Sequence, residues 1–220
     1  VLDLIMQPER GAGSFTLEPR AGRRDTPTAN GGDAQADDIS MVLHTSGTTS
    51  RPKIVPLSQR NLAASARHIR DTLAFTSADC GLNVMPLFHI HGLIAGVLAP
   101  LAAGSQVFCT PGFNALKFFA WMDEAHPSWY TAVPTMHQAI LGRAAKNADV
   151  IARHPLRFLR SSSSSIPPQV IRELEDVFGA PLVEAGGQQR LDRRRHRDLP
   201  TSRLLHERNH FLDIERVALG

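Results

Sequence analysis

Cysteine is scarce in this sequence, which has only Cys80 and Cys109 among its 220 residues. The two lie in otherwise apolar stretches and lack the C-x-x-C spacing of zinc sites and redox motifs. We therefore expect neither a zinc site nor a disulfide framework, and we expect a reducing compartment. The final Ala-Leu-Gly is not the usual peroxisomal tripeptide. A cytoplasmic location is expected, with the peroxisome as the alternative.

Long apolar runs are also missing. The best candidate, residues 90–103, is interrupted by His91 and Pro100 and falls short of the roughly 18 residues that span a membrane. We expect no membrane partner. With 42% hydrophobic and 20% charged residues the composition is that of an ordinary globular protein, so one domain with a sizeable core is the default expectation.

Most of the chain, residues 1–185, has no net charge. The formal net charge is +3, and residues 186–220 alone carry eight Arg, no Lys and five acidic residues, so the remainder sums to zero. The cluster at residues 193–197 (Arg-Arg-Arg-His-Arg) leaves open a basic module that binds nucleic acid or another polyanion. Interleaved acids and the lack of an aromatic platform beyond Phe211 argue against it, and we expect no nucleic-acid partner.

Hydrophobic periodicity predicts alternating strands and helices from residue 39 onward. Strands are expected at residues 39–43, 54–57, 82–85, 106–109, 129–133, 157–160 and 182–184. Helices are expected from a Ser58 cap to about Phe75, within 90–103, from Asn114 to about Ala125, from Pro134 to about Asn147, and at 168–178. This alternation predicts the α/β class, with a mainly parallel sheet flanked by helices.

Three regions differ in composition. Residues 1–37 show no sustained period and contain the turn cluster Asn30-Gly31-Gly32-Asp33, which indicates an irregular lead-in. Residues 38–185 hold the alternating strands and helices and are expected to form the domain proper. Residues 186–220 form the Arg-rich tail.

The stretch that most narrows the function is Thr45-Ser46-Gly47-Thr48-Thr49-Ser50-Arg51-Pro52-Lys53. Gly47 lets the backbone turn its N–H groups inward, the hydroxyls donate further hydrogen bonds, and Lys53 adds a compact positive charge. The common P-loop is excluded because Pro52, not Gly, precedes Lys53. An exposed Ser/Thr turn is the alternative, but the flanking predicted strands favour a polyphosphate loop at the carboxyl end of a parallel strand.

This stretch resembles the phosphate-loop signature Thr-Ser-Gly-Thr-Thr-Gly-x-Pro-Lys of the acyl-adenylate-forming enzymes and departs from it at Ser50. Ser50, with His44 before the loop, looks most like the oxalyl-CoA synthetase branch. The resemblance implies that ATP and a small carboxylic acid, oxalate or similar, form an acyl-adenylate, and that CoA then displaces AMP. It implies ATP and Mg²⁺ as cofactors and CoA as co-substrate. The residues implied around the phosphates are Thr45, Ser46, Gly47, Thr48, Thr49, Ser50 and Lys53.

Two later segments extend the resemblance. Residues 86–92 (Pro-Leu-Phe-His-Ile-His-Gly) resemble the family's Pro-Leu-Phe-His-x-x-Gly motif, which implies that His89 lies beside the acyl group and, with Lys53, is a catalytic candidate. His89 and His91 have no nearby cysteine or carboxylate, so no metal site is expected. The serine run 161–165 alone would suggest a flexible linker. Its position resembles the family's adenine segment, which implies the cofactor-binding residues Ser162, Ser163 and Ser164.

The resemblance ends after Ala185, where the family has Tyr-Gly-x-Thr-Glu and this chain has Gly-Gly-Gln-Gln-Arg. The Tyr that stacks on adenine is replaced by Gly186, and the Glu that holds Mg²⁺ is replaced by Arg190, which would repel the metal. The family's later motifs have no counterpart in residues 191–220. We therefore expect an inactive fragment of a synthetase with a frame-shifted or mis-spliced tail, a diverged tail being the alternative.

Overall fold

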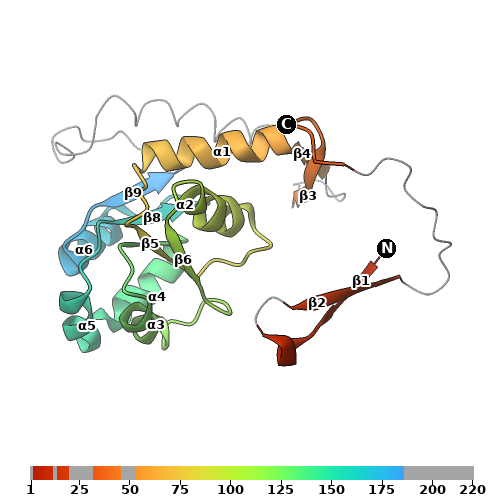
Figure 1. Cartoon of the computed structure of the whole chain (residues 1–220). Helices are drawn as coiled ribbons and strands as arrows, with labels where there is room; N and C mark the ends of the chain where they lie inside the picture. Colours follow the sequence, from red (N-terminus) through yellow and green to blue (C-terminus); the bar gives the residue numbers. More distant parts are fainter. Residues whose placement is uncertain (1, 12–13, 20–31, 46–52, 186–220) are drawn as a thin grey trace. The chain divides into compact units, whose positions relative to one another are not determined.

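The computed structural model of the chain describes residues 2–11, 14–19, 32–45 and 53–185. The chain divides into two compact units, Val1–Ala34 and Gln35–Gly220, each of which is described by itself (Figure 1). The smaller unit contains the antiparallel strands β1 (Leu2–Met6) and β2 (Phe15–Pro19). The expectation of an irregular lead-in is therefore wrong for these residues. Strands of five residues are too short for a period to be recognised, and their pairing partner defines them.

The larger unit is built on a five-stranded sheet in which all neighbouring strands are parallel. The order is β6-β5-β7-β8-β9, and the register places Asn83 beside Thr131 and Thr131 beside Arg160. The predicted α/β class with a mainly parallel sheet is thus confirmed. The strands are β5 (Cys80–Asn83), β6 (Gln106–Cys109), β7 (Trp129–Ala132), β8 (Phe158–Ser162) and β9 (Leu182–Ala185).

The strands on either side of the predicted phosphate loop form a separate hairpin. β3 (Ile39–Thr45) and β4 (Lys53–Ser58) pair antiparallel in a two-stranded sheet, with Thr45 opposite Lys53. Both strands were predicted, but the expectation that the loop follows a strand of the parallel sheet is wrong. Two strands joined by a short connection can pair directly, whereas parallel pairing needs a longer crossover.

The helices follow the predicted apolar periodicity and end signals. Ser58 and Asn61 form a reciprocal capping box at the start of α1, and Gly179, with φ of 61°, closes α6. Helix α5 was not predicted. The helices are α1 (Gln59–Thr72), a π-helix (His91–Leu98) continued by α2 (Ala99–Leu101), α3 (Phe118–Ala125), α4 (Pro134–Ala144), α5 (Ala148–Arg153) and α6 (Pro168–Phe178).

Two buried clusters hold these helices on opposite faces of the parallel sheet. Successive residues of a strand point to opposite faces, so Tyr130 and Leu159 enter one cluster while Trp129 and Phe158 enter the other. The first cluster is completed by α3, α4 and α6, and the second by α1, the π-helix and β4. Figure 1 accordingly shows α1 on one side of the sheet and α3 to α6 on the other. The larger unit is a three-layer α/β/α structure.

The π-helix is held close to the sheet by the side chain of Asn83. Its amide nitrogen donates to the carbonyl oxygen of Gly92 at 3.1 Å, and its amide oxygen accepts from the N–H of Met85 at 3.1 Å. A Cβ placed on Gly96 would lie 2.7 Å from three atoms of the Asn83 side chain. The absence of a side chain at Gly96 therefore lets the amide lie directly against the helix.

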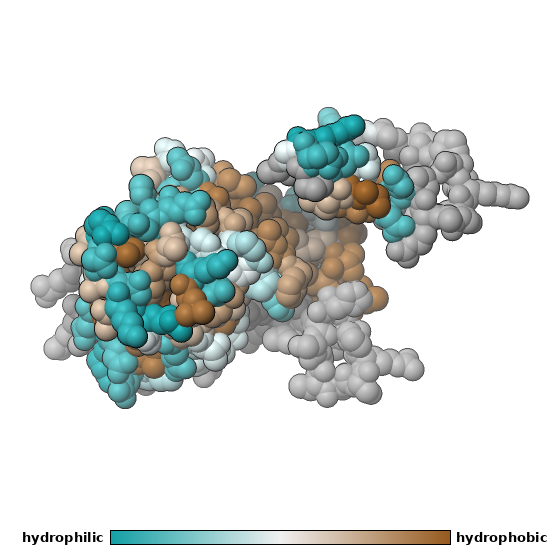
Figure 2. Space-filling view, turned by 90° about the horizontal axis from the view of Figure 1, so that it is seen from below, coloured by the Kyte–Doolittle hydropathy of each residue, from teal (hydrophilic) through white to brown (hydrophobic). Residues whose placement is uncertain are grey.

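The surface of the larger unit mixes hydrophobic and hydrophilic residues. On the face seen in Figure 2, brown hydrophobic residues are interspersed with teal hydrophilic ones. Ile54, Phe88 and Leu116 are the most exposed large hydrophobic residues among those described. In the described part of the chain, no helix is both apolar enough and long enough to cross a membrane. Both cysteines are free thiols.

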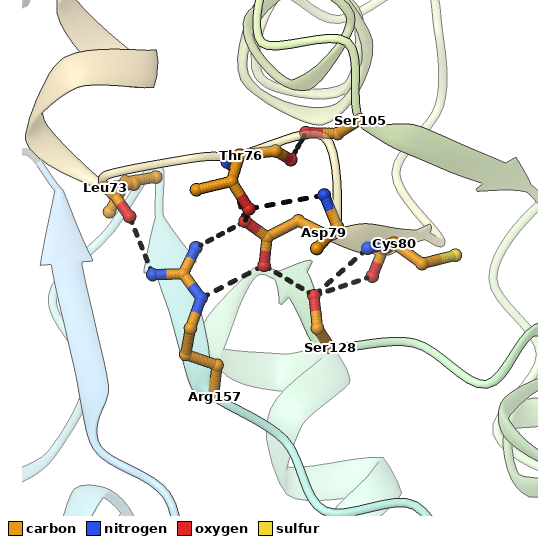
Figure 3. A network of polar contacts seen from close by, with 8 residues as sticks. Leu73, Thr76, Asp79, Cys80, Ser105, Ser128 and Arg157 are labelled. Atoms are coloured by element: carbon orange, nitrogen blue, oxygen red, sulfur yellow. Dashed lines mark hydrogen bonds and ion pairs between the residues drawn. The ribbon is translucent and has the colours of Figure 1, made fainter.

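A polar network joins the amino-terminal ends of the central strands (Figure 3). The carboxylate of Asp79, just before β5, accepts from Ser128 Oγ at 2.8 Å and from Arg157 Nε and Nη2 at 3.0 and 3.1 Å. It also accepts from the N–H of Thr76 at 2.8 Å. Arg157 Nη1 donates to the carbonyl oxygen of Leu73 at 2.9 Å. One carboxylate thus connects the end of α1 with the starts of β5, β7 and β8.

Candidate functional site

The order of the parallel strands reverses between β5 and β7. From β5 the chain passes to β6 on one side, through the π-helix on one face of the sheet, and then returns to β7 on the other side of β5. From β6 onward the connecting helices α3, α4 and α6 lie on the opposite face. In open α/β sheets ligands bind outside the carboxyl ends of the strands at such a reversal. This edge is therefore the candidate site.

His91 is the polar side chain that joins the elements at this edge. It begins the π-helix after β5 and is only 3% exposed. Its Nε2 lies 2.6 Å from Oγ1 of Thr131 on β7, and its Nδ1 lies 3.3 Å from Oγ of Ser163 after β8. Sequence reasoning gave His91 no role. Its partners lie 40 and 72 residues further along the chain, so no local pattern could reveal them.

The surroundings of His91 keep its ring neutral. Burial, the positive charge of Arg160, and the nearby rings of His137 and His89 together lower the pKa of His91 from 6.5 to about 2. Burial disfavours a charged imidazole because the interior solvates the charge poorly. At neutral pH His91 therefore has one nitrogen that donates a hydrogen bond and one that accepts.

A second buried histidine supports the same edge from the other face. His137 on α4 lies with Nδ1 3.0 Å from the hydroxyl of Tyr130 and with Nε2 3.2 Å from the carbonyl oxygen of Arg160. A carbonyl oxygen can only accept, so Nε2 carries the proton and Nδ1 accepts from Tyr130. Burial outweighs the backbone hydrogen bonds and lowers the pKa of His137 from 6.5 to about 4. The pKa of Tyr130 is raised by burial, so its hydroxyl stays protonated.

Because His91 and His137 are buried in the neutral form, we expect mild acid to lower the free energy of unfolding. Each pKa is lower in the folded than in the unfolded chain, so stability is complete above the unfolded pKa of 6.5 and falls with pH down to about 4 for His137 and about 2 for His91. Between pH 7.5 and 5.5 we expect a loss of about 2–3 kcal/mol in the free energy of unfolding, measured by denaturant titration. His137→Gln should roughly halve this loss. Ser165→Ala, at an exposed residue without a titratable side chain, should leave it unchanged; an equal pH dependence in both variants would contradict the assignment.

The serine run lies where the strand order predicts ligands to gather. Ser161 and Ser162 end β8 and are buried, while Ser163 and Ser164 are exposed in the following loop. Ser163 has φ of 77°, the left-handed region that few residues other than glycine adopt. A flexible linker does not describe this segment, because Ser162 is buried at the end of β8 and the side chain of Ser163 contacts His91.

His89 lies at the same edge, in the loop between β5 and the π-helix. Its side chain is exposed and its ring lies 4.7 Å from the ring of Phe88. Its N–H donates to the carbonyl oxygen of Pro86 at 3.2 Å, which fixes the turn that carries it.

The described residues include only the two ends of the predicted phosphate loop, Thr45 and Lys53. The hairpin register brings the backbones of Thr45 and Lys53 opposite each other. Ser46, Gly47, Thr48, Thr49 and Ser50 lie outside the described residues, as do Gly186, Arg190 and the basic cluster 193–197.

A magnesium site does not emerge from the described part of the chain. Within those residues no three His, Cys, Asp or Glu side chains gather as a metal site requires. Mg²⁺ prefers carboxylate oxygens and water, whereas the side chains that meet at the candidate site are imidazoles, hydroxyls and the guanidinium of Arg160. The described residues therefore do not fit this ion.

The amino-acid sequence is similar to that of known enzymes. A family model described as AMP-binding enzyme matches residues 7–189. An oxalate–CoA ligase of Arabidopsis thaliana is 48% identical over 152 residues, which cover 68% of this chain and 29% of that protein. An oxalate–CoA ligase of Saccharomyces cerevisiae is 38% identical over 154 residues, covering 70% of this chain and 28% of that protein.

Solved structures give the same fold. ATP-bound MatB from Rhodopseudomonas palustris matches with a TM-score of 0.62 and 30% identity, over 69% of this chain and 29% of that chain. A malonyl-CoA ligase complex with methylmalonyl-CoA and AMP bound matches with a TM-score of 0.63 and 26% identity, over 78% and 35%. The chain spans less than a third of the length of the two curated ligases. Because the family model covers most of the chain, this protein belongs to the AMP-binding enzyme family.

Proposed function

We propose that the chain is part of an ATP-dependent, AMP-forming acid–CoA ligase that activates a small carboxylic acid, oxalate, through an acyl-adenylate. CoA is the second substrate and displaces AMP to form the thioester. The observation that carries the proposal is the 48% identity to an oxalate–CoA ligase over a segment that includes most of the larger unit. The presence of Ser50 in the phosphate loop and of serines at 162–164 supports the same acid.

The phosphate-binding role belongs to the β3–β4 hairpin. Pairing of Thr45 with Lys53 brings the two ends of the motif opposite each other, and the sequence between them supplies the glycine and hydroxyl residues that can bind an anion. Lys53 supplies the positive charge. The loop and Lys53 would steady the charge on the phosphates while the carboxylate attacks in line.

His89 and the serine loop would hold the other parts of the reacting molecules. The exposed ring of His89, at the reversal of strand order, is proposed to lie beside the acyl group. Ser162, Ser163 and Ser164 are proposed to lie against the adenine, where small side chains leave room for a flat ring. Residues 38–185 would form the partial adenylation domain, and a cytoplasmic location is part of the proposal.

We expect Lys53→Ala and Thr48→Ala to raise the KM for ATP roughly ten- to a hundredfold, because each removes a donor to the phosphates. The measurement uses a chimera in which residues 35–185 of this chain replace the matching segment of the Arabidopsis ligase. His89→Ala in the same chimera should change the relative kcat/KM for oxalate and malonate while leaving the KM for ATP nearly unchanged. Lys146→Ala, an exposed lysine far along the chain, is the matched control.

Three outcomes would contradict the proposal. An unchanged KM for ATP in both loop variants would remove the phosphate-site assignment. Equal losses for both acids and for ATP in His89→Ala would make His89 a structural residue. A chimera that folds but activates no acid would refute the function itself. No observation on the described residues favours the alternative of a nucleic-acid-binding module.

A further inference from the structure

We propose that His91 is a positioning residue that fixes the hydroxyl of Ser163 so that its proton points to the bound ligand. The inference rests on the proposed function, because the ligand is the acid or nucleotide of that reaction. It assigns a task to a buried side chain that the reaction steps above do not use. The chemistry that Ser163 would recognise is a hydrogen-bond acceptor, either a purine nitrogen or a carboxylate oxygen.

The ring of His91 is held from several sides. It is 3% exposed and sits at the first position of the π-helix, whose next residue, Gly92, lies tight against the carbonyl oxygen of Pro86. A Cβ on Gly92 would overlap that oxygen, so only glycine allows the start of the π-helix to lie this close to the turn after β5. Thr131, the partner of Nε2 at 2.6 Å, is fully buried in β7. The ring therefore has little freedom to rotate.

The neighbours of His91 decide which nitrogen carries its proton. Arg160 Nη1 lies 3.5 Å from Thr131 Oγ1, and a guanidinium can only donate, so the threonine oxygen accepts from it. This contact occupies one of the two lone pairs of the threonine oxygen, and in the proposed arrangement Thr131 donates its own proton to Nε2 of His91. The positive charge of Arg160 favours the same arrangement, because it attracts the lone pair of an unprotonated Nε2.

With Nε2 accepting, Nδ1 carries the proton and donates to the hydroxyl oxygen of Ser163 at 3.3 Å. The proton of the Ser163 hydroxyl is then free to be donated elsewhere. Ser163 is exposed, and its left-handed backbone lifts it out of the line of β8. A chain of hydrogen bonds thus runs from Arg160 through Thr131 and His91 to Ser163, and each bond polarises the next.

The charged and titratable groups that face His91 are Arg160, His137 and His89. His137 is neutral with its proton on Nε2, and the ring of His91 is neutral throughout the pH range in which enzymes of this kind are assayed. The orientation of Ser163 is therefore expected to be independent of pH between about 5 and 8.

The tautomer is tested on the full chain labelled with ¹⁵N-histidine. A two-bond ¹H–¹⁵N spectrum should show one neutral histidine protonated on Nδ1 that does not titrate between pH 5 and 8 and is missing from His91→Phe. In Ser163→Ala, whose exposed side chain can be removed without unfolding, the same resonance should shift. A His91 signal protonated on Nε2, or one that titrates in this range, would overturn the inference.

The consequence for ligand binding is tested by a double-mutant cycle in the ligase chimera. His91→Phe and Ser163→Ala should each lower kcat/KM roughly ten- to a hundredfold, and the double variant should be no worse than either alone. The KM for ATP will rise if the acceptor is a purine nitrogen, and the KM for oxalate if it is a carboxylate oxygen. Ser165→Ala, an exposed serine two residues on, is the control.

Losses that multiply in the double variant would show that His91 does not act through Ser163 and would overturn the inference. Full activity of Ser163→Ala would do the same. If the unaltered chimera folds and activates no acid, the proposed function fails and this inference fails with it. The tautomer on the full chain is a separate readout, so the two failures can be told apart.

Discussion

A ligase chimera that carries this chain through Arg190 is expected to be at least about a thousandfold less active than one that carries it only through Ala185. The resemblance implies that, in the family's Tyr-Gly-x-Thr-Glu motif, the Glu holds Mg²⁺ and the Tyr stacks on adenine. This chain has Arg190 and Gly186 at those positions. Exchanging a carboxylate for a guanidinium removes a ligand and places a positive charge where another must bind. The measurement is pyrophosphate exchange with oxalate and ATP.

The matched variants of this experiment separate the two defects. Arg190→Glu in the longer chimera should restore most of the exchange, and Gly186→Tyr should mainly lower the KM for ATP. Equal activity of the two chimeras would refute the view that the tail is foreign to the enzyme. The coding DNA gives an independent check, since another reading frame that continues as Tyr-Gly-x-Thr-Glu would identify residues 186–220 as a frame-shift product.

Asp79→Ala is expected to lower the free energy of unfolding by about 3 kcal/mol, measured by denaturant titration at pH 7. The carboxylate accepts five hydrogen bonds, from Thr76, Ser128 and Arg157, and the residue is only 5% exposed. Removing it leaves the N–H of Thr76 and the partly buried guanidinium of Arg157 without their acceptor. The end of α1 and the starts of three strands would lose their common anchor.

Asp123→Ala is the control for this prediction. Asp123 accepts from Arg153 and His154 at 2.8 Å, as close as any contact of Asp79, but its side chain is 48% exposed. Water screens such a pair, so no measurable loss is expected. If Asp123→Ala lowered the free energy of unfolding as much as Asp79→Ala, contact distance and not burial would determine how much each carboxylate stabilises the fold.

Protonation of Asp79 at low pH is also expected to lower the free energy of unfolding. Burial opposes ionisation, but the hydrogen bonds from Thr76 and Ser128 and the charge of Arg157 outweigh it and lower the pKa of Asp79. Its contribution is present above the ordinary carboxyl pKa of 3.8 and is lost as the pH falls through the lower folded value. This loss begins below the pH at which the histidines start to weaken the fold, and it overlaps the part that His91 contributes.

The central α/β alternation could be predicted from the sequence because its signals are local. Strand β6 was predicted at its observed bounds, and helix α6 was marked at both ends, by Pro168 and by Gly179. The strand order and the antiparallel pairing of β3 with β4 could not be predicted, because they depend on which segments meet in space. For the same reason the short strands β1 and β2 were missed.

The candidate site was predictable only where a motif is contiguous. His89 and the serine run could be predicted because each lies in a stretch of recognisable residues; the structure places His89 in the loop after β5 and the serines at and after the end of β8. His91, Thr131 and Arg160 were missed because they are brought together by β7, β8 and the π-helix. Their burial, which makes their hydrogen bonds specific, is a property of the folded chain alone.

The close contact between Asn83 and Gly96 has a consequence for how this family can diverge. Any side chain at position 96 would occupy the space of the Asn83 amide, so a larger residue there is tolerated only together with a smaller one at position 83. A smaller residue at 83 would in turn leave the carbonyl of Gly92 and the N–H of Met85 without their present partner. Evolution is therefore expected to change the two positions together or to leave both alone.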